Sequence, residues 1–178
     1  KHPCANPDRR QAFIEQLEPF KQDNHPIIYL DESGFKGSSY RPYAYTPKGQ
    51  RCFEVYNWQA KNQTNAIGAI HNNQLFAVGL YECSINSQVF YSWVEQVLLP
   101  ELPPNSVIVM DNATFHKRQD IQYLIQEHHH TILWLPPYSP DLNPIEQVWS
   151  WMKGLRQGWR LDSIDDLFFY FMWICTSF

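Results

Sequence analysis

The sequence lacks the features that mark membrane proteins and secreted, disulfide-bonded proteins. It contains no apolar run long enough to cross a bilayer, and its first residues, KHPCANPDRRQAF, hold no apolar stretch of the kind found in signal peptides. The four cysteines lie far apart with no CxxC pair, which indicates reduced thiols rather than a zinc site or a disulfide framework: they are Cys4, Cys52, Cys83 and Cys175. We therefore expect a cytoplasmic protein with no membrane partner.

Positive charge is also scarce. Lysine and arginine number 14 against 18 aspartates and glutamates, a net charge of −4, whereas a nucleic-acid partner normally calls for clustered cations. The cations that are present do gather locally, in a loop, after a strand and along the last helices: Arg41, Lys48 and Arg51; Lys117 and Arg118; Lys153, Arg156 and Arg160. Each group is either part of a local basic face or ordinary solvated surface charge.

What the sequence does contain is enough apolar residues for one globular domain. Of the 178 residues, 44% are hydrophobic and 16% aromatic. Short apolar runs predict strands at Ile27 to Leu30, in TNAIGAI, in LFAVGLYE, at Val107 to Met110 and in TILWL. Helical spacing predicts helices from Pro7 to Phe20, from Ser87 to Leu99 with Pro100 as its end, around Ile121 to Ile125, around Ile145 to Met152, and from about Asp162 with Asp165 as its capping acid. Residues 36–62 read as an irregular excursion with one hairpin around TPKGQR.

This order predicts an α/β fold in which helices cover a mixed sheet. A right-handed crossover through the Ser87 helix returns the Val107 strand parallel to an earlier strand. If that neighbour is the Ile27 strand, then Asp31 and Asp111, each placed at the C-terminal end of its strand, lie side by side. Carboxylates on strands about 4.8 Å apart repel each other, and a divalent cation between them removes the repulsion. Mg²⁺ suits such an open cluster at the edge of a sheet.

The stretch LPPYSPDLNPIEQVW supplies a third carboxylate, Glu146. One interpretation is structural: Asn143 as N-cap, Pro144 at the first helical position and Glu146 three residues after the cap make a regular helix start. In the other, the four prolines hold Glu146 rigidly as a third metal ligand, which lets the site bind two ions about 3.5–4 Å apart. Asp31 has a comparable structural alternative as the cap of a turn.

Three blocks of the sequence, YLDESGF, VIVMDNATFHK and LPPYSPDLNPIEQVWSWMK, closely resemble the catalytic blocks of DDE transposases of the mariner superfamily, in particular its bacterial insertion-sequence branch. Asp111 and Glu146 are 146 − 111 = 35 positions apart, which leaves 34 residues between them, as in that branch. The resemblance implies a ribonuclease-H-like fold with a five-stranded sheet in the order 3-2-1-4-5 flanked by helices. It also implies that Asp31, Asp111 and Glu146 bind two Mg²⁺ ions, for which Mn²⁺ substitutes.

The same resemblance implies metal-dependent cleavage at transposon ends, followed by attack of the freed 3′-hydroxyl on target DNA. Its implied partners are DNA, a second copy of the chain on DNA, involving the aromatic C-terminal segment, and a helix-turn-helix reader of the terminal repeats, because complete relatives carry such modules before the catalytic part. We expect a lead-in helix in residues 1–25, the catalytic domain in 26–160 and an amphipathic helix in 161–178. The implied location is the bacterial cytoplasm, in association with the nucleoid.

Further residues are candidates for contacts around the site. Asn112, His116 and Lys117 fall in the second resembling block and are expected to orient the site or touch DNA, although a turn asparagine and a surface histidine explain the first two equally well. Arg41, Lys48 and Arg51 are expected to grip DNA outside the site. Glu32 should point to the opposite face from Asp31, and Asp141, the nearest rival of Glu146, suits a turn. The run of His128 to His130 fits a solvated helix end better than a metal site.

Two alternatives remain open from the sequence. In one, the chain keeps the fold and serves as an inactive binding or assembly module. In the other, the same carboxylates belong to a ribonuclease-H-like metal nuclease that acts on branched or hybrid nucleic acid and joins no strands.

Overall fold

A computed structural model describes residues 4–36, 63–159, 161 and 163–176. Its centre is a five-stranded sheet in the order β3-β2-β1-β4-β5. The strands are β1 (Ile27–Lys36), β2 (Gln63–His71), β3 (Gln74–Tyr81), β4 (Val107–Met110) and β5 (Thr131–Trp134). β1, β2 and β3 pair antiparallel, whereas β1, β4 and β5 pair parallel. This confirms the predicted mixed sheet and its order. Arg41, Lys48, Arg51 and the hairpin predicted around TPKGQR lie outside the described residues.

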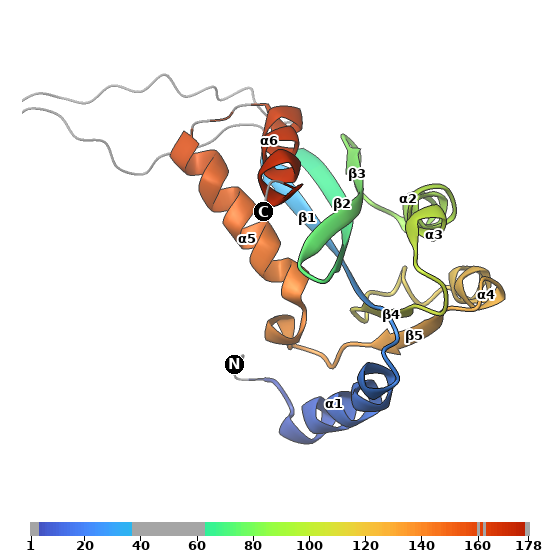
Figure 1. The fold of residues 1–178 in the computed structure, drawn as a ribbon. Helices are drawn as coiled ribbons and strands as arrows, with labels where there is room; N and C mark the ends of the chain where they lie inside the picture. Colours follow the sequence, from blue (N-terminus) through green and yellow to red (C-terminus); the bar gives the residue numbers. More distant parts are fainter. Residues whose placement is uncertain (1–3, 37–62, 160, 162, 177–178) are drawn as a thin grey trace, which may run out of the picture.

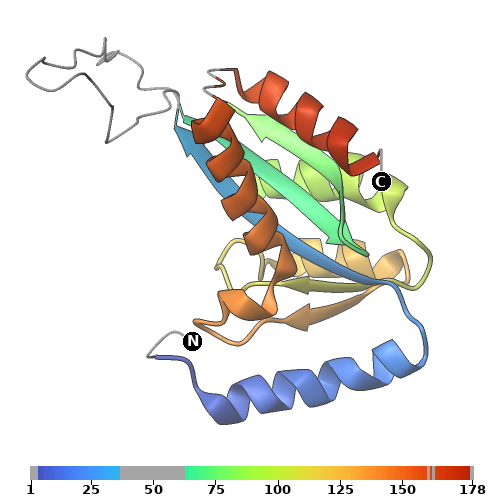
Figure 2. The same cartoon turned by 60° about the vertical axis from the view of Figure 1, so that its left-hand side comes forward.

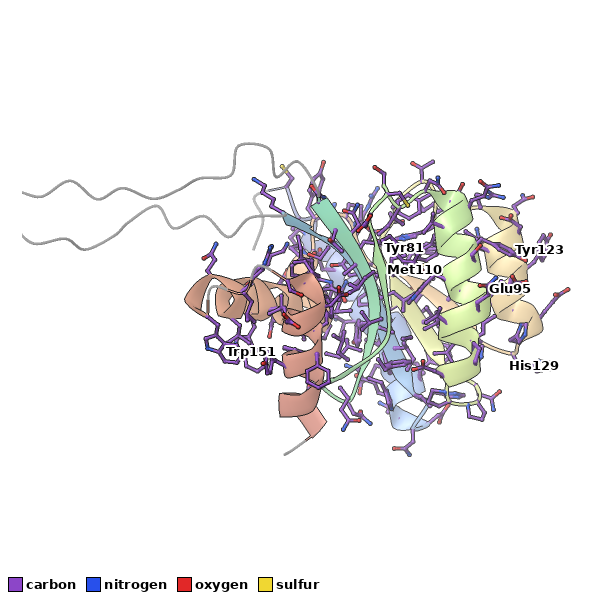
Figure 3. All side chains as sticks on the ribbon, turned by 90° about the horizontal axis from the view of Figure 1, so that it is seen from above. Tyr81, Glu95, Met110, Tyr123, His129 and Trp151 are labelled. Carbon is purple, nitrogen blue, oxygen red and sulfur yellow. The ribbon has the colours of Figure 1, made fainter. Side chains whose placement is uncertain are left out.

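Helices cover both faces of the sheet (Figure 1). α2 (Ser87–Trp93) and α4 (Gln119–Glu127) lie on one face, where they bury Ile28, Leu30, Ile108 and Met110. α5 (Pro144–Trp159) and α6 (Ile164–Thr176) cover β1, β2 and β3 on the other face, and α1 (Pro7–Gln22) packs on the β4 and β5 side through Phe13 and Leu17 (Figure 2). Seen from above, the sheet lies between these two layers, with Trp151 on α5 and Tyr123 on α4 pointing outward (Figure 3). No helix in the described ranges is long and apolar enough to span a membrane.

β1 is longer than predicted. The strand continues through Asp31 to Lys36, because β2 pairs with it from Tyr29 to Lys36 and Asp31 lies opposite Gly68. The pairing with β4 ends much earlier, at Tyr29 opposite Val109. Asp31 therefore lies in the middle of β1, at the point where the neighbouring strand β4 has ended and Asp111 follows.

The helix predicted from Ser87 to Leu99 does not stop at Pro100. α2 begins at the N-cap Asn86, whose side chain accepts hydrogen bonds from the backbone of Gln88 and Val89. It then widens into a π-helical turn, η1 (Val94–Leu98), in which the Leu99 amide donates to the Val94 carbonyl, and continues as α3 (Leu99–Glu101). A π turn changes the hydrogen-bond register, which allows a residue without an N–H to follow it inside the helix.

The other helix ends follow local side-chain chemistry. Asn6 caps α1 by accepting from Asp8 and Arg9, and Pro7 occupies the first helical position. α6 begins after Ser163, whose hydroxyl accepts from the Asp166 amide at 3.1 Å. This bond caps the helix start. Asp162, the cap expected from the sequence, lies outside the described residues.

Gly68 makes room for the helix that carries Glu146. A Cβ added at Gly68 would lie 3.0 Å from Cη2 of Trp149, which is 2% exposed and has little space to retreat. We expect Gly68→Ala to lower the free energy of unfolding by about 1–3 kcal/mol, because overfilling a packed core displaces side chains. Urea unfolding measures this change. The matched control is Gly154→Ala in α5, where nothing lies within 4 Å of the added Cβ, so a gain of up to about 1 kcal/mol is expected. Equal effects of the two substitutions would contradict this account.

Candidate active site

Three carboxylates from three separate elements line one cavity. Asp31 comes from the middle of β1, Asp111 directly follows β4, and Glu146 lies in the first turn of α5. The cavity has a volume of about 250 Å³, and its other lining residues are Asn112, Asn143 and the proline-rich loop at residues 135–140. The structure thus brings together the three acids that the sequence nominated, although Asp111 and Glu146 are far apart along the chain.

Asp31 is the acid whose pKa is most affected by this arrangement. Burial raises its pKa, and the nearby charges of Glu146, Glu32 and Asp111 raise it further, to about 8. A carboxyl group in these surroundings therefore holds its proton at neutral pH unless a cation compensates the charge. The pKa of Asp31 is raised because the three carboxylates, which come from separate elements, concentrate negative charge in a partly buried space.

Asp111 and Glu32 are joined by a buried histidine. His116 contacts Asp111 through Nδ1 and Glu32 through Nε2, both at 2.7 Å, and its side chain is 2% exposed. Burial alone would lower the pKa of His116, but the hydrogen bonds to Asp111 and Glu32 outweigh burial and raise it to about 9. The protonated ring donates from both nitrogens. The hydrogen bond from His116 in turn lowers the pKa of Asp111 and outweighs its partial burial, and the Ala113 amide adds a second bond at 2.8 Å.

This geometry corrects one expectation and supports another. His116 packs against Phe90 and Phe115 in the core beneath α2, so it is placed to orient Asp111 and not to touch DNA directly. Glu32 does face away from Asp31. It lines a second cavity of about 560 Å³ on the other side of β1, which Asp111 also lines. Glu32 could be excluded from the three metal-binding acids on the sequence alone, but its contact with His116 was not predicted. The one hint of a role for Glu32 was its position next to Asp31.

We expect His116→Ala to lower metal-dependent DNA cleavage by about 10–100-fold, the usual cost of removing a group that orients a metal ligand. The physical reason is that Asp111 loses the partner that fixes its carboxylate, while Glu32 and Asp111 lose the cation between them. Single-turnover cleavage rates measure the effect. His128→Ala is the matched control, because His128 is an exposed histidine whose ring bonds to the Leu124 carbonyl, away from the carboxylate cavity. Unchanged cleavage by His116→Ala would remove its orienting role.

The proline-rich loop is fastened at both ends. The Leu135 amide donates to the Met110 carbonyl at 2.9 Å, and the Asn143 amide group donates to the Leu30 carbonyl at 3.2 Å. Asn112, at the same edge, donates to the Leu135 carbonyl. Asn143 was expected to cap α5 with its side chain; instead its amide ties the start of α5 to the residue before Asp31. These bonds fix Glu146 relative to the two aspartates.

Asp141 has a structural role. Both its carboxylate oxygens accept hydrogen bonds from Arg10 of α1, at 2.8 and 2.7 Å, and it does not line the carboxylate cavity. This pair attaches the short helix η2 (Pro140–Leu142) to α1. The rival of Glu146 is therefore engaged elsewhere, and Asp141 provides a natural control for substitutions of Glu146.

The donors in the cavity fit a hard divalent cation, since they are carboxylate and amide oxygens. Among the described residues, the Asn143 Oδ1 atom is buried and has no hydrogen-bond partner. Within the described part of the chain, however, no three His, Cys, Asp or Glu side chains are already arranged as a metal-binding group. The reason is that Asp111 Oδ1 is turned toward His116 and the Ala113 amide. The donor set therefore suits a cation, while the carboxylate of Asp111 is directed toward His116.

The basic candidates differ in their surroundings. Lys117 is exposed beside the site, with its ammonium group 5.5 Å from the centre of the Trp134 ring. Arg118 is bound to Asp120 and Ser87. Arg156 is 5% exposed and donates to the backbone carbonyls of Leu161 and Lys36, so it is a structural cation and not part of a basic surface.

The histidine run serves the end of α4. His128 bonds the Leu124 carbonyl, His129 adopts a left-handed backbone, and His130 accepts from the Ser106 amide at 3.1 Å. The side chains of His128 and His130 thus bond to different parts of the backbone.

The sheet order and the helices on both faces make this a ribonuclease-H-like fold, with acids gathered where its central strands meet. Residues 26–167 match the family model described as DDE superfamily endonuclease, so the chain belongs to this family. A curated relative, "Uncharacterized protein y4pE/y4sA" of Sinorhizobium fredii (strain NBRC 101917 / NGR234), is 35% identical over 60 residues, which cover 34% of this chain and 40% of that protein.

Solved structures of Mos1 transposase share the fold. The catalytic domain of Mos1 mariner transposase matches with a TM-score of 0.65 and 16% identity, covering 92% of this chain and 77% of that chain. The mariner Mos1 paired-end complex with Mg matches with a TM-score of 0.72 and 18% identity, covering 96% of this chain and 55% of that one. A complex with Mn gives a TM-score of 0.71 at 18% identity, covering 92% and 52%. The chain thus spans about half the length of the Mos1 chains in these complexes.

Proposed function

We propose that this chain is the catalytic domain of a DDE transposase of the bacterial insertion-sequence branch of the mariner superfamily. It cleaves DNA at transposon ends and transfers the freed 3′-hydroxyl to target DNA. The observation that carries the proposal is the single cavity in which Asp31, Asp111 and Glu146 meet, each supplied by a different element of the fold. We assign residues 26–160 to the catalytic domain, residues 1–25 to a lead-in helix and residues 161–178 to a C-terminal helix.

Asp31, Asp111 and Glu146 would hold two Mg²⁺ ions, or Mn²⁺ in their place, as the named metals in the Mos1 complexes suggest by analogy. When bound, such ions neutralise charge on the reacting phosphate and lower the pKa of a water molecule. The chain itself contributes position. His116 orients Asp111, the Asn143 amide ties α5 to β1, and the prolines of residues 136–144 limit the movement of Glu146.

DNA is the proposed partner. Relatives in this comparison form a paired-end complex with a transposon end, so we propose that two copies of this chain act together on DNA. We further propose that a helix-turn-helix module, in the same protein or in a separate subunit, reads the terminal repeat. The proposed DNA contacts are Asn112, which lines the cavity, the exposed Lys117, and Arg41, Lys48 and Arg51. The proposed location is the bacterial cytoplasm, on the nucleoid.

Two DNA assays test the proposal. A supercoiled plasmid is incubated with Mg²⁺ or Mn²⁺ and either the wild-type chain or Asp111→Asn, and a labelled 3′-hydroxyl end is offered for joining to the plasmid. We expect nicking and joining by the wild type and neither by the variant. Equal behaviour of the two proteins would indicate an inactive binding module. Nicking that depends on Asp111 without any joining would indicate a metal nuclease.

A further inference from the structure

A separate cavity lies beyond the start of α5, beside the turn between β2 and β3. It has a volume of about 480 Å³, within the size range of small-ligand sites. Its floor is largely apolar, with Ile27, Tyr29, Ile70 and Pro144, and its rim is polar, with Lys21, His25, His71 and three asparagines. No aspartate or glutamate lines it, although the chain as a whole has a net charge of −4. A positive and amide-rich rim above an apolar floor favours an anionic ligand with an apolar part.

The rim offers hydrogen-bond donors that nothing in the described part of the chain uses. Lys21 is exposed at the end of α1, and neither its ammonium group nor the side-chain amides of Asn24 and Asn73 have a hydrogen-bond partner among the described residues. Asn24, Asn72 and Asn73 all have positive φ, at 57°, 49° and 64°. Glycine would meet that backbone demand at lower cost, so the demand alone does not explain why asparagine occupies all three positions. Each asparagine adds an amide group to the rim.

Unpaired carbonyls at a helix C-terminus repel anions, but several carbonyls at the end of α1 are hydrogen-bonded. The carbonyls of Pro19, Phe20 and Lys21 accept from the amides of Asp23, His25 and Asn24 at 2.9, 2.9 and 3.1 Å. These bonds satisfy the last carbonyls of the helix and reduce their exposure. The charge that remains at this point of the rim is that of Lys21.

The cavity is a neighbour of the carboxylate site. Tyr29 precedes Asp31 by two residues on the same face of β1, a distance of about 7 Å along a strand. Pro144 lines this cavity, while Asn143 and Glu146 line the carboxylate cavity, so the first turn of α5 separates the two. Along β1, the spacing of Tyr29 and Asp31 equals about two nucleotide steps of one DNA strand, each with a rise of about 3.4 Å.

We propose that this cavity binds one nucleotide of the DNA strand, with its phosphate on Lys21 and the side-chain amides of Asn24 and Asn73, and its base or sugar on the floor formed by Tyr29 and Ile70. The inference rests on the proposed function, because it takes the strand that crosses the carboxylate site as its ligand. It adds a contact point outside the three acidic blocks, on α1 and the β2–β3 turn.

DNA binding in EDTA, followed by fluorescence anisotropy of a labelled duplex at several salt concentrations, tests this site without requiring cleavage. We expect the double substitution Lys21→Gln with Asn73→Gly to weaken binding by about 5–10-fold and to reduce the salt dependence by about one ion. Glycine at position 73 keeps the left-handed backbone while removing the amide. Arg9→Gln removes the same charge from an exposed position on α1 outside the cavity and is expected to change binding less than twofold.

Two results would overturn the inference. One is a double variant that binds DNA with unchanged affinity and salt dependence, or no more weakly than Arg9→Gln. The other comes from NMR, in which the backbone amide chemical shifts of Asn72 and Asn73 are followed during titration with inorganic phosphate, a mononucleotide and the duplex. If phosphate changes these shifts and the duplex does not displace the bound phosphate, the cavity is not a DNA site. If the wild type cleaves DNA and the double variant binds DNA normally, only this site is rejected. If the double variant loses binding but the wild type does not cleave DNA, only the proposed function is rejected.

Discussion

Glu146→Gln is expected to lower the rate of DNA strand cleavage by about three orders of magnitude while leaving the fold intact. The substitution keeps the size of the side chain and removes one of three charges that face a common cavity. Electrostatic groups that act on the reacting centre typically contribute 10²–10³-fold each, and loss of a metal ligand adds to this. Single-turnover cleavage of a labelled duplex with saturating Mg²⁺, with circular dichroism to check the fold, measures the effect.

Asp141→Asn is the paired control for this experiment. Asp141 lies five residues before Glu146 in the sequence, but it forms an ion pair with Arg10 and does not line the carboxylate cavity. Ion pairs near the surface contribute little, so we expect the cleavage rate of Asp141→Asn to stay within about threefold of the wild type. A severe loss in Asp141→Asn together with a mild loss in Glu146→Gln would reverse the assignment of the third acid.

Asp31→Asn is expected to abolish cleavage and, in the absence of divalent cations, to stabilise the fold by roughly 2–4 kcal/mol at pH 7. The gain arises because Asp31 has a pKa of about 8 in the folded chain, whereas the ordinary pKa of an aspartate is 3.8. Between these two values the folded state binds more protons than the unfolded state, so the stability of the wild type falls as pH rises from about 4 to 8. Asparagine has no proton to bind, and its advantage grows over the same range and levels off above pH 8.

Thermal and urea unfolding in EDTA from pH 5 to pH 9 measures the stability difference between wild type and Asp31→Asn. Addition of Mg²⁺ or Mn²⁺ should stabilise the wild type and narrow the gap, since a ligand that binds only the folded state adds stability as its concentration rises. Asp120→Asn, an exposed acid far from the cavity and paired with Arg118, should show no such pH dependence. A gap that stayed constant with pH would show that Asp31 is ionised in the folded chain and would contradict its burial among like charges.

Much of this architecture could be predicted from the sequence because its signals are local. Short apolar runs identify the strands, and the crossover rule makes β4 parallel to an earlier strand. The resemblance of the three blocks then supplied the sheet order, which puts β4 beside β1 and Asp111 near Asp31. It also supplied Glu146, which local reasoning alone would have assigned to capping.

The remaining features depend on partners distant in the chain. Arg10 and Asp141 are 131 positions apart, and the Asn143 amide reaches the Leu30 carbonyl across 113. His116 looked equally suited to the surface, because its burial depends on Phe90 and Glu32, which the sequence does not place beside it. The extension of β1 past Asp31 likewise follows from its pairing with β2, and the passage of the helix through Pro100 from a change in hydrogen-bond register. No local pattern encodes these contacts.

Asp111 lines two cavities, one together with Glu146 and the other together with Glu32. This shared position opens a route to inhibition that needs no chelating group. A compound bound in the larger cavity beside Glu32 would contact Asp111 from the side away from Glu146 and would compete with the His116 contact that orients this carboxylate. Selectivity would then come from residues such as Asn65 and Ile85, which line that cavity and not the carboxylate cavity. Such a drug would leave the ions of other enzymes untouched.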